Sequence, residues 1–229
     1  MVDKYEAKKF VASIIGEEYV IPTLGVWDRF DDIDFSTLPK QFVLKCTHDS
    51  GGLVIVRDKS KVDIEAAKAK IERSLKRNYF WQSREWPYKN VKPRIIAEKY
   101  MSDGNHANLP VYKIFCFNGL PRIIQTIQND KQKNETIDYF DTNWQLLNLR
   151  QNFPNSKTPL CCPSTSLEMQ KIAQALAANY SFIRIDLYTI EGKPMFSEYT
   201  FFSDAGMAKF DPPEWDKTLG DWLVLPNLQ

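Results

Sequence analysis

A hairpin of two strands is the clearest feature in the hydrophobic pattern of this chain. From Phe182 to Ile190 the residues alternate, with branched aliphatic side chains on one face and charged or aromatic side chains on the other. A second strand is predicted from Pro194 to Phe202. Residues 191–193, Glu-Gly-Lys, suit a three-residue loop between the strands, because glycine adopts a left-handed conformation without strain.

The register of this hairpin predicts a pair of opposed carboxylates. If residues 190 and 194 pair, Asp186 lies across from Glu198 and Arg184 across from Thr200, all on one face. Directly opposed like charges are destabilising because their Cβ atoms are only about 4.5–5.5 Å apart, so a cation is expected between them. Mg²⁺ accepts such oxygen ligands in sites that use ATP. Two alternatives stay open: a solvated charged face, and a two-residue loop that turns Glu198 to the other face.

A second candidate site follows a buried strand in the first half of the chain. Residues 41–45, QFVLK, are followed by the small polar segment 46–52, CTHDSGG, and by the apolar run 53–56. Backbone N–H groups of such a loop can bind a phosphate, and Lys45 at the strand end can add a point charge. The alternative is an ordinary hairpin turn, with a surface lysine and with His48 as a hydrogen-bonding loop residue rather than a base.

The remaining pattern predicts a mixed chain of helices and short strands. Helices are expected from Asp3 to Gly16, over 62–77, and after Thr165, which with Glu168 has the spacing of a capping box. Strands are expected at 94–101, 111–118, 121–127, 137–140 and 144–149. The loop 102–110 is the best candidate for a boundary between lobes. The aromatic residues of 79–88 fit either core packing or a stacking platform for a sugar or a base.

Composition and charge narrow the functional class. The chain has 229 residues, 43% of them hydrophobic, which is enough to bury a core. Thirty basic and twenty-nine acidic residues give a net charge of +1, which argues against a nucleic-acid binder that relies on overall charge. No apolar run reaches the ~18 residues of a membrane span, and the four cysteines lack metal-ligand spacing. We therefore expect a cytoplasmic protein with reduced thiols.

The order of these segments resembles the ATP-grasp superfamily and, within it, the teichuronopeptide-biosynthesis (TupA-like) branch. The resemblance is carried by Asp3-Lys4, FVLKCTHDSGG at 42–52, REWPYKNVKPRIIAEKY at 84–100, YKIFCFNG at 112–119, RIDLY at 184–188 and EYTF at 198–201. Each segment alone is a weak signal, whereas their joint occurrence in this order is specific. The resemblance implies an α+β ATP-grasp fold of two lobes with the nucleotide between them, and a reduced or missing N-terminal pre-ATP-grasp lobe.

The resemblance also implies a role for each of three segments of the chain. Residues 1–44 are expected to form a helix and connector that complete the nucleotide site, 45–101 the small lobe with the phosphate loop and hinge, and 102–229 the large lobe with the metal-binding hairpin. The residues implied to contact ATP are Lys4, Lys45, His48, Ser50, Gly51, Gly52, Glu98, Lys99, Tyr100, Met101 and Lys113. Asp186 and Glu198 are implied to hold Mg²⁺, and Arg184 and Lys45 to act on the transferred phosphoryl group.

The implied activity is an ADP-forming carboxylate–amine ligase that works through an acyl phosphate. Its expected partners are ATP, Mg²⁺, an amino acid and a uronic-acid carboxylate of a cell-surface polysaccharide, with no nucleic acid and no membrane span. Two positions depart from the pattern: Thr200 stands where many ATP-grasp enzymes have asparagine, and Val111 where the branch usually has an acidic residue. A small-molecule or sugar kinase and a non-catalytic nucleotide-binding module stay open as alternatives, as does the oligomeric state.

Overall fold

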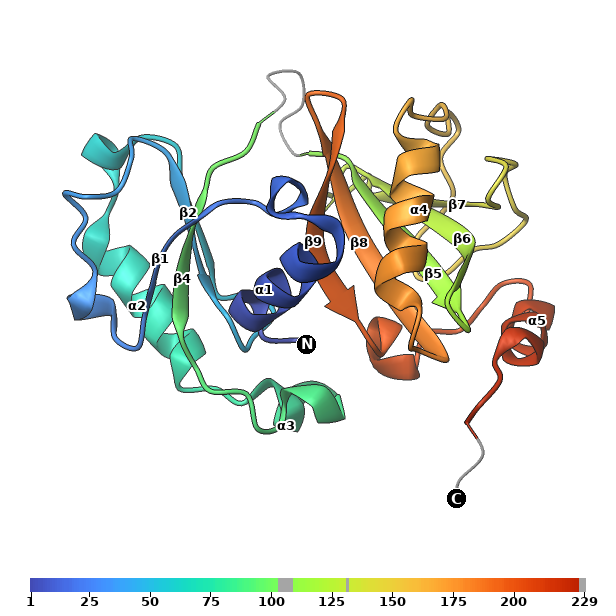
Figure 1. Cartoon of the computed structure of the whole chain (residues 1–229), viewed down its shortest axis with the longest axis horizontal. Helices are drawn as coiled ribbons and strands as arrows, with labels where there is room; N and C mark the ends of the chain where they lie inside the picture. The colour runs from blue at the N-terminus through green and yellow to red at the C-terminus, as the bar shows by residue number, and fades with distance from the viewer. Residues whose placement is uncertain (103–108, 131, 227–229) are drawn as a thin grey trace. The chain divides into compact units, whose positions relative to one another are not determined.

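The computed structural model describes residues 1–102, 109–130 and 132–226, and these fold into two compact α+β units (Figure 1). The first unit comprises residues 1–10 and 21–101, and the second comprises residues 11–20 and 102–229. Helix α1, Lys4–Ile15, therefore contributes to both units. Most of the loop expected to separate the lobes lies outside the described residues, and the functional division into 1–44, 45–101 and 102–229 stays a prediction.

The first unit is built on a four-stranded antiparallel sheet in the order β1-β4-β2-β3. The strands are β1 Thr23–Trp27, β2 Phe42–Cys46, β3 Leu53–Val56 and β4 Ile95–Lys99. Alternation along β2 buries Phe42, Leu44 and Cys46 in the core and leaves Lys45 on the opposite face. Helix α2, Ile64–Leu75, packs on β2 and β3 (Figure 1), and the short helix α3, Tyr79–Ser83, follows it.

Both principal helices of this unit begin at aspartate caps. The Asp63 side chain accepts a hydrogen bond from the Ala66 N–H at 2.9 Å and starts α2. The Asp3 side chain accepts hydrogen bonds from the N–H groups of Tyr5 and Glu6, at 2.9 and 3.0 Å, and starts α1. The short 3-10 helices of the chain are η1 Glu17–Tyr19, η2 Phe30–Asp32, η3 Lys59–Lys61, η4 Trp86–Tyr88 and η5 Ser203–Gly206.

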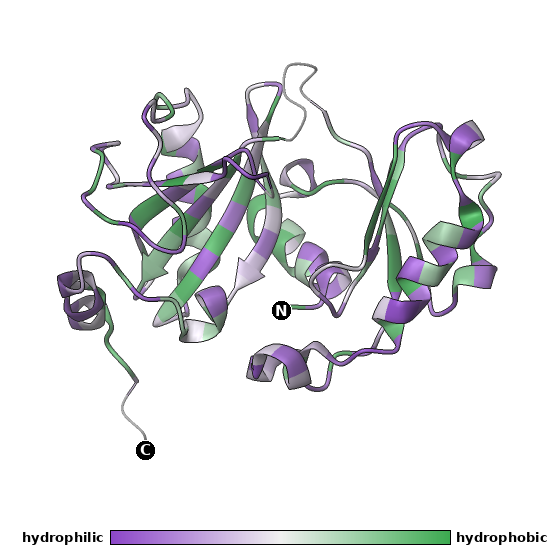
Figure 2. Cartoon of the chain, turned by 180° about the vertical axis from the view of Figure 1, so that it is seen from behind, coloured by the Kyte–Doolittle hydropathy of each residue, from purple (hydrophilic) through white to green (hydrophobic). Residues whose placement is uncertain are grey.

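The second unit is built on a five-stranded antiparallel sheet in the order β7-β6-β5-β8-β9. The strands are β5 Val111–Phe117, β6 Leu120–Gln128, β7 Thr136–Phe140, β8 Phe182–Ile190 and β9 Lys193–Thr200. Helix α4, Ser166–Ala177, packs on β5, β6 and β8 through a buried stripe that includes Met169, Ala173 and Leu176. Helix α5 is Glu214–Trp222. Figure 2 shows hydrophobic and hydrophilic residues alternating along the strands of this sheet.

The β8–β9 hairpin places the two predicted carboxylates opposite each other, but its loop and register differ from those predicted. Ile190 pairs with Lys193, so the loop has two residues and the predicted three-residue loop is wrong. A β-bulge then adds Ser197 to β9, because Leu187 pairs with Phe196 while Asp186 pairs with Glu198. The extra residue restores the alternation, and the opposition of Asp186 to Glu198 and of Arg184 to Thr200 is confirmed.

Two other local predictions are wrong. Residues 144–149 form no strand and contribute only an isolated bridge from Leu146 to Phe140. Thr165 precedes α4 as predicted but has helical backbone angles, and its side chain makes no capping hydrogen bond. Its hydroxyl instead lies 3.1 Å from that of Thr189, and Glu168 accepts a hydrogen bond from the Tyr19 hydroxyl at 2.8 Å. Tertiary partners thus replace the local capping box.

A buried cluster of three charges joins α1, β2 and β4 within the first unit. The Glu98 carboxylate forms ion pairs with Lys8 through Oε1 and with Lys45 through Oε2, the latter at 2.6 Å. Glu98 is 5% exposed and Lys8 is 6% exposed. Burial by itself would raise the pKa of Glu98, but the two ammonium groups outweigh it and lower this pKa to about 2. Burial lowers the pKa of Lys8, against the attraction of Glu98.

This cluster predicts that the substitution Glu98→Gln destabilises the protein. At neutral pH the free energy of unfolding is expected to fall by about 3–5 kcal/mol, since the change leaves the buried Lys8 without its counter-charge. Because the pKa of Glu98 is lower in the folded state than its ordinary 4.5, its contribution is present above that value and is lost as the pH falls toward about 2.

Urea unfolding monitored by circular dichroism between neutral and acidic pH tests this prediction. The difference between the wild type and Glu98→Gln should shrink as the pH falls below about 4.5. The exposed Glu17, changed to Gln, is the control and should change stability little at any pH. Equal unfolding midpoints for wild type and Glu98→Gln at neutral pH would refute a stabilising role for the cluster.

Candidate active site

The loop after β2 is held to the end of α2 by His48 and Asp49. His48 and Asp49 are 2% and 1% exposed. The Asp49 carboxylate accepts hydrogen bonds from the Ser74 hydroxyl and from Arg77, the latter at 2.5 Å. Ser50 and Gly51 are exposed, so the outward part of the loop is limited to its tip. Movement of this loop is therefore expected at the tip rather than along its whole length.

The position of His48 favours the hydrogen-bonding role over the base. Its Nε2 lies 3.2 Å from the carbonyl oxygens of both Ser74 and Arg77, so Nε2 carries a proton and donates. Nδ1 is then the acceptor, and it is buried with no hydrogen-bond partner among the described residues. Burial lowers the pKa of His48, which keeps the ring neutral near neutral pH.

Gly51 and Gly52 are required for different reasons. Gly51 has a φ of +115°, a left-handed conformation that a side chain would strain. Gly52 packs against α2: a Cβ atom there would lie 2.2 Å from the Ser74 Oγ and 2.9 Å from the Cys46 Sγ. The backbone of the loop can thus approach α2 closely only because residue 52 is glycine. The predicted phosphate loop keeps its shape through these two positions.

The two lysines that were predicted to bind phosphates lie in different environments. Lys45 projects from β2 to the Glu98 carboxylate. The Nζ of Lys4 donates a hydrogen bond to the backbone oxygen of Asp49 at 2.6 Å, at the base of the loop. The lysine that shares Glu98 with Lys45 is Lys8, one helical turn beyond Lys4 in α1. Sequence reasoning missed Lys8, although its i,i+4 spacing from Lys4 was a usable signal.

The predicted hinge residues occupy the end of β4. The Glu98 side chain faces the two lysines, and the Lys99 N–H donates to the carbonyl oxygen of Pro22 at 3.0 Å. The Tyr100 hydroxyl accepts a hydrogen bond from the Arg57 Nε at 3.3 Å. Met101 is the last residue of the first unit. The contacts with ATP that the resemblance implies for these residues stay a prediction.

In the second unit, Arg184 and Asp186 form a buried bidentate ion pair. The Arg184 Nε and Nη2 donate to Asp186 Oδ1 and Oδ2 at 2.7 and 2.8 Å. The remaining donors of Arg184 reach the hydroxyls of Ser203 and Thr200, at 2.9 and 3.0 Å. Burial opposes the charge on Arg184, but Asp186 outweighs it and raises the pKa of the guanidinium. The cation expected beside the opposed carboxylates is thus partly supplied by the chain itself.

A polar row crosses the whole five-stranded sheet at the level of Asp186. Reading across the strands, the paired residues are Glu198, Asp186, Lys113, Gln125 and Tyr139. The Lys113 Nζ lies 4.0 Å from Asp186 Oδ2, and the Gln125 Nε2 donates to the Tyr139 hydroxyl at 2.8 Å. The Oε1 of Gln125 is buried without a hydrogen-bond partner in the described part of the chain. The sheet register therefore assembles Lys113 with the predicted metal ligands.

The donor set of this row suits a hard divalent cation. Glu198 is half-buried, and no hydrogen bond or ion pair to its carboxylate occurs among residues 1–102, 109–130 and 132–226. An ionised carboxylate has about four acceptor positions, so Asp186 retains capacity beside its two bonds to Arg184. Within the same residues there is no group of three or more His, Cys, Asp or Glu side chains that could hold a metal by themselves. A cation here would complete its shell with water and phosphate oxygens.

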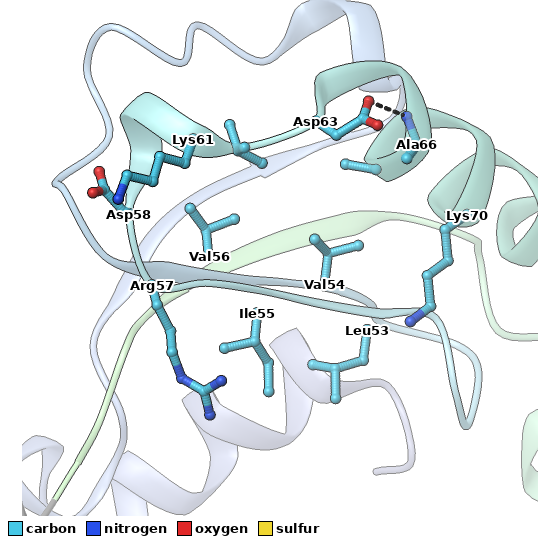
Figure 3. Close-up of a pocket in the computed structure, with 12 residues that line it drawn as sticks. Leu53, Val54, Ile55, Val56, Arg57, Asp58, Lys61, Asp63, Ala66 and Lys70 are labelled. Carbon is cyan, nitrogen blue, oxygen red and sulfur yellow. Dashed lines mark hydrogen bonds between the residues drawn. The ribbon is translucent and has the colours of Figure 1, made fainter. Parts of the chain in front are cut away.

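A groove of about 700 Å³ beside β3 does not coincide with the predicted site (Figure 3). It is lined by β3, the following turn and the first turns of α2, including Arg57, Lys61 and Lys70. Val54 and Val56 point toward α2, whereas Leu53 and Ile55 point to the other side of the strand (Figure 3). None of the predicted site residues lines this groove.

A model of the family described as TupA-like ATPgrasp matches residues 1–224. Among solved structures, the chain is similar to a D-alanine–D-alanine ligase from Bacillus anthracis complexed with ATP, with 16% identity, a TM-score of 0.53, and coverage of 96% of this chain and 59% of that one. It is also similar to D-alanyl-alanine synthetase A from Vibrio cholerae, with 11% identity, a TM-score of 0.53, and coverage of 89% and 56%. A search of curated proteins finds no match.

These comparisons bear on the fold and the family. The chain spans less than two thirds of the length of the two ligases. No helix within the described residues has the length and apolar character needed to span a bilayer. Two antiparallel sheets in separate α+β units, together with the likeness to these ligases, confirm the predicted ATP-grasp fold. The chain belongs to the TupA-like ATP-grasp family.

Proposed function

We propose that this protein is an ATP- and Mg²⁺-dependent ligase that joins a carboxylate to an amine through an acyl phosphate. The observation that carries the proposal is the bulged β8–β9 hairpin, which opposes Asp186 and Glu198 and packs Arg184 against them. Two carboxylates and an arginine on one face match what phosphoryl transfer requires, namely charge neutralisation and alignment. Membership of the ATP-grasp family supports the same assignment.

The first unit supplies the groups that we assign to the phosphates of ATP. Lys45 and Lys8 present two ammonium groups on one carboxylate, and the glycine loop that follows β2 offers backbone N–H groups. We therefore add Lys8 to the predicted phosphate ligands, and we infer that Lys4, whose Nζ donates to the Asp49 carbonyl oxygen, also anchors the loop. Glu98 then positions both lysines rather than contacting the phosphates itself.

The proposed reaction has two steps, and neither requires a nucleophilic side chain. A carboxylate oxygen of the acid substrate attacks the γ-phosphorus of ATP, and ADP leaves. The amine then attacks the acyl carbon, inorganic phosphate leaves, and the amine loses a proton. Arg184 and the lysines neutralise charge on the transferred group. Mg²⁺, held by Asp186 and Glu198, would shield the phosphate oxygens and fix their orientation.

Membership of the family, rather than the fold, supports a more specific proposal for the two substrates. The family's relation to teichuronopeptide biosynthesis supports a uronic-acid carboxylate as the acid substrate, carried by a cell-surface polysaccharide or its precursor. It also supports an amino acid as the amine substrate. Cys46, Cys116, Cys161 and Cys162 are all free thiols, which supports a cytoplasmic site for the reaction. A sugar kinase on the same fold would give a stable phosphoester and no amide.

The metal pair predicts that Asp186→Asn and Glu198→Gln each lower ATP turnover by about a hundredfold or more, because each removes a charged ligand of the Mg²⁺ that would shield the transferring phosphate. The exposed Asp216, changed to Asn, is the matched control and should retain wild-type turnover. Paramagnetic resonance of Mn²⁺ with a non-hydrolysable ATP analogue gives a second readout. Near-normal turnover and Mn²⁺ binding in both variants would remove these residues from the site.

The cluster of Lys8, Lys45 and Glu98 predicts that loss of either lysine weakens ATP binding. Lys45→Met and Lys8→Met should each weaken ATP binding by about tenfold or more, since a hydrogen bond to a charged group contributes about 1.5–3 kcal/mol. The exposed Lys40, changed to Met, should bind ATP as the wild type does. Calorimetric titration measures the affinities, and circular dichroism confirms folding. Unchanged affinity in Lys8→Met, with a loss in Lys45→Met, would return Lys8 to a purely structural role.

A further inference from the structure

Two exposed tryptophans and two cations form a surface on the first unit that the proposed reaction does not use. Trp81 in α3 is 62% exposed and Trp86 in η4 is 64% exposed. Arg84 and Lys89 lie beside them, and Phe80, only 8% exposed, lies beneath. We call Trp81, Arg84, Trp86 and Lys89 the tryptophan surface. Neighbouring exposed aromatic rings offer a contiguous apolar surface on which a ligand can stack.

The tryptophan rings are held in place from below. Phe80 makes edge-to-face contacts with both, at ring-centroid distances of 5.0 Å to Trp81 and 5.8 Å to Trp86. The Arg84 guanidinium lies 5.1 Å from the Trp81 ring and the Lys89 ammonium 4.4 Å from the Trp86 ring. Each exposed ring is therefore paired with its own cation. A ligand would meet rings that are already ordered, which lowers the entropic cost of binding.

The charge of this surface is not balanced by neighbouring acids. Neither Arg84 nor Lys89 forms a salt bridge with an acidic side chain among the described residues. Glu85, the one acidic residue between Trp81 and Lys89, is only 9% exposed. The exposed side thus presents aromatic faces and positive charge together. An anionic ligand with apolar faces matches both features.

The tryptophan surface is also connected to the proposed phosphate loop. Arg77, just before α3, binds the buried Asp49 carboxylate at 2.5 Å. A ligand on the tryptophan surface would therefore lie on the segment that anchors this loop. The occupant is accordingly expected to be part of the acid substrate.

We propose that the tryptophan surface binds an extended anionic saccharide, a chain of carboxylated sugars whose reacting unit lies at the loop. The proposal rests on the proposed function, because it identifies the acid substrate as an oligomer rather than a single sugar. The C–H faces of sugar rings stack on Trp81 and Trp86, and carboxylates of the chain bind Arg84 and Lys89.

Two other occupants fit the charge and aromaticity less well. Membrane-surface binding usually uses an amphipathic helix with a long apolar face, whereas α3 has five residues. Single-stranded nucleic acid also stacks on aromatic rings, but its binding relies on many phosphate contacts, and the chain has a net charge of only +1. Both occupants are outcomes of the test below.

Calorimetric and fluorescence titrations of the full-length protein test the proposal. The probes are oligogalacturonate, a neutral malto-oligosaccharide of equal length, monomeric galacturonate, phosphatidylglycerol vesicles and oligodeoxythymidine. Oligogalacturonate should bind about tenfold or more tightly than the neutral oligomer and the monomer. The double variant Trp81→Ala/Trp86→Ala should lose this binding, and Trp81→Phe/Trp86→Phe should retain most of it. Arg84→Gln/Lys89→Gln should remove the preference for the acidic oligomer.

The controls separate this proposal from the proposed reaction. Lys217, an exposed lysine of the second unit with 79% side-chain exposure, changed to Gln, should bind oligogalacturonate as the wild type does. Binding is measured in Glu198→Gln, so it does not depend on turnover. Saccharide binding without ligase activity would contradict the reaction alone. Equal oligogalacturonate binding by the wild type and Trp81→Ala/Trp86→Ala, or tighter binding of vesicles or oligodeoxythymidine, would overturn the proposal.

Discussion

The register of the five-stranded sheet is the constraint on which the proposed catalytic geometry depends. A strand pair has only two faces, so a shift of one residue turns every side chain to the other side. The two-residue loop between β8 and β9 would by itself turn Glu198 away from Asp186, and the extra residue Ser197 in the bulge reverses this effect. The same register extends through Lys113 and Gln125 to Tyr139, so one polar row crosses five strands.

Each unit holds a buried cluster of opposite charges. In the first unit, the buried Glu98 pairs with the buried Lys8 and with the partly exposed Lys45. In the second, Arg184 and Asp186 form two parallel hydrogen bonds. Such clusters contribute little net stability compared with a hydrophobic core, but removing one partner is costly. Under the proposed function, the first cluster, with two lysines to one carboxylate, would keep a preorganised net positive charge for a transferring phosphoryl group.

Sequence reasoning predicted the elements better than the partners of their side chains. The strands β3 and β8 have the predicted bounds, because β3 is an apolar run that follows two glycines and β8 alternates strongly. The bulge at Ser197 was not predictable, since it depends on the fit of β9 to β8 rather than on local composition. Glu98 was assigned to the hinge from its motif, whereas its lysine partners come from β2 and α1, far away in sequence. The predicted capping box does not form for the same reason: the side chains of Thr165 and Glu168 make hydrogen bonds to residues distant in sequence.

The fate of the carboxylate oxygens of the substrate tests the central claim most directly. Incubation of the protein with ATP, Mg²⁺, an amino acid and an ¹⁸O-carboxylate-labelled uronic acid should release ADP and inorganic phosphate that carries one labelled oxygen, because the oxygen that attacks the γ-phosphorus leaves with the phosphate. Hydroxylamine should trap the acyl phosphate as a hydroxamate. Release of AMP and pyrophosphate would indicate adenylation instead, and a stable phosphorylated sugar without amide would indicate a kinase. Either result would contradict the ligase mechanism proposed for this chain.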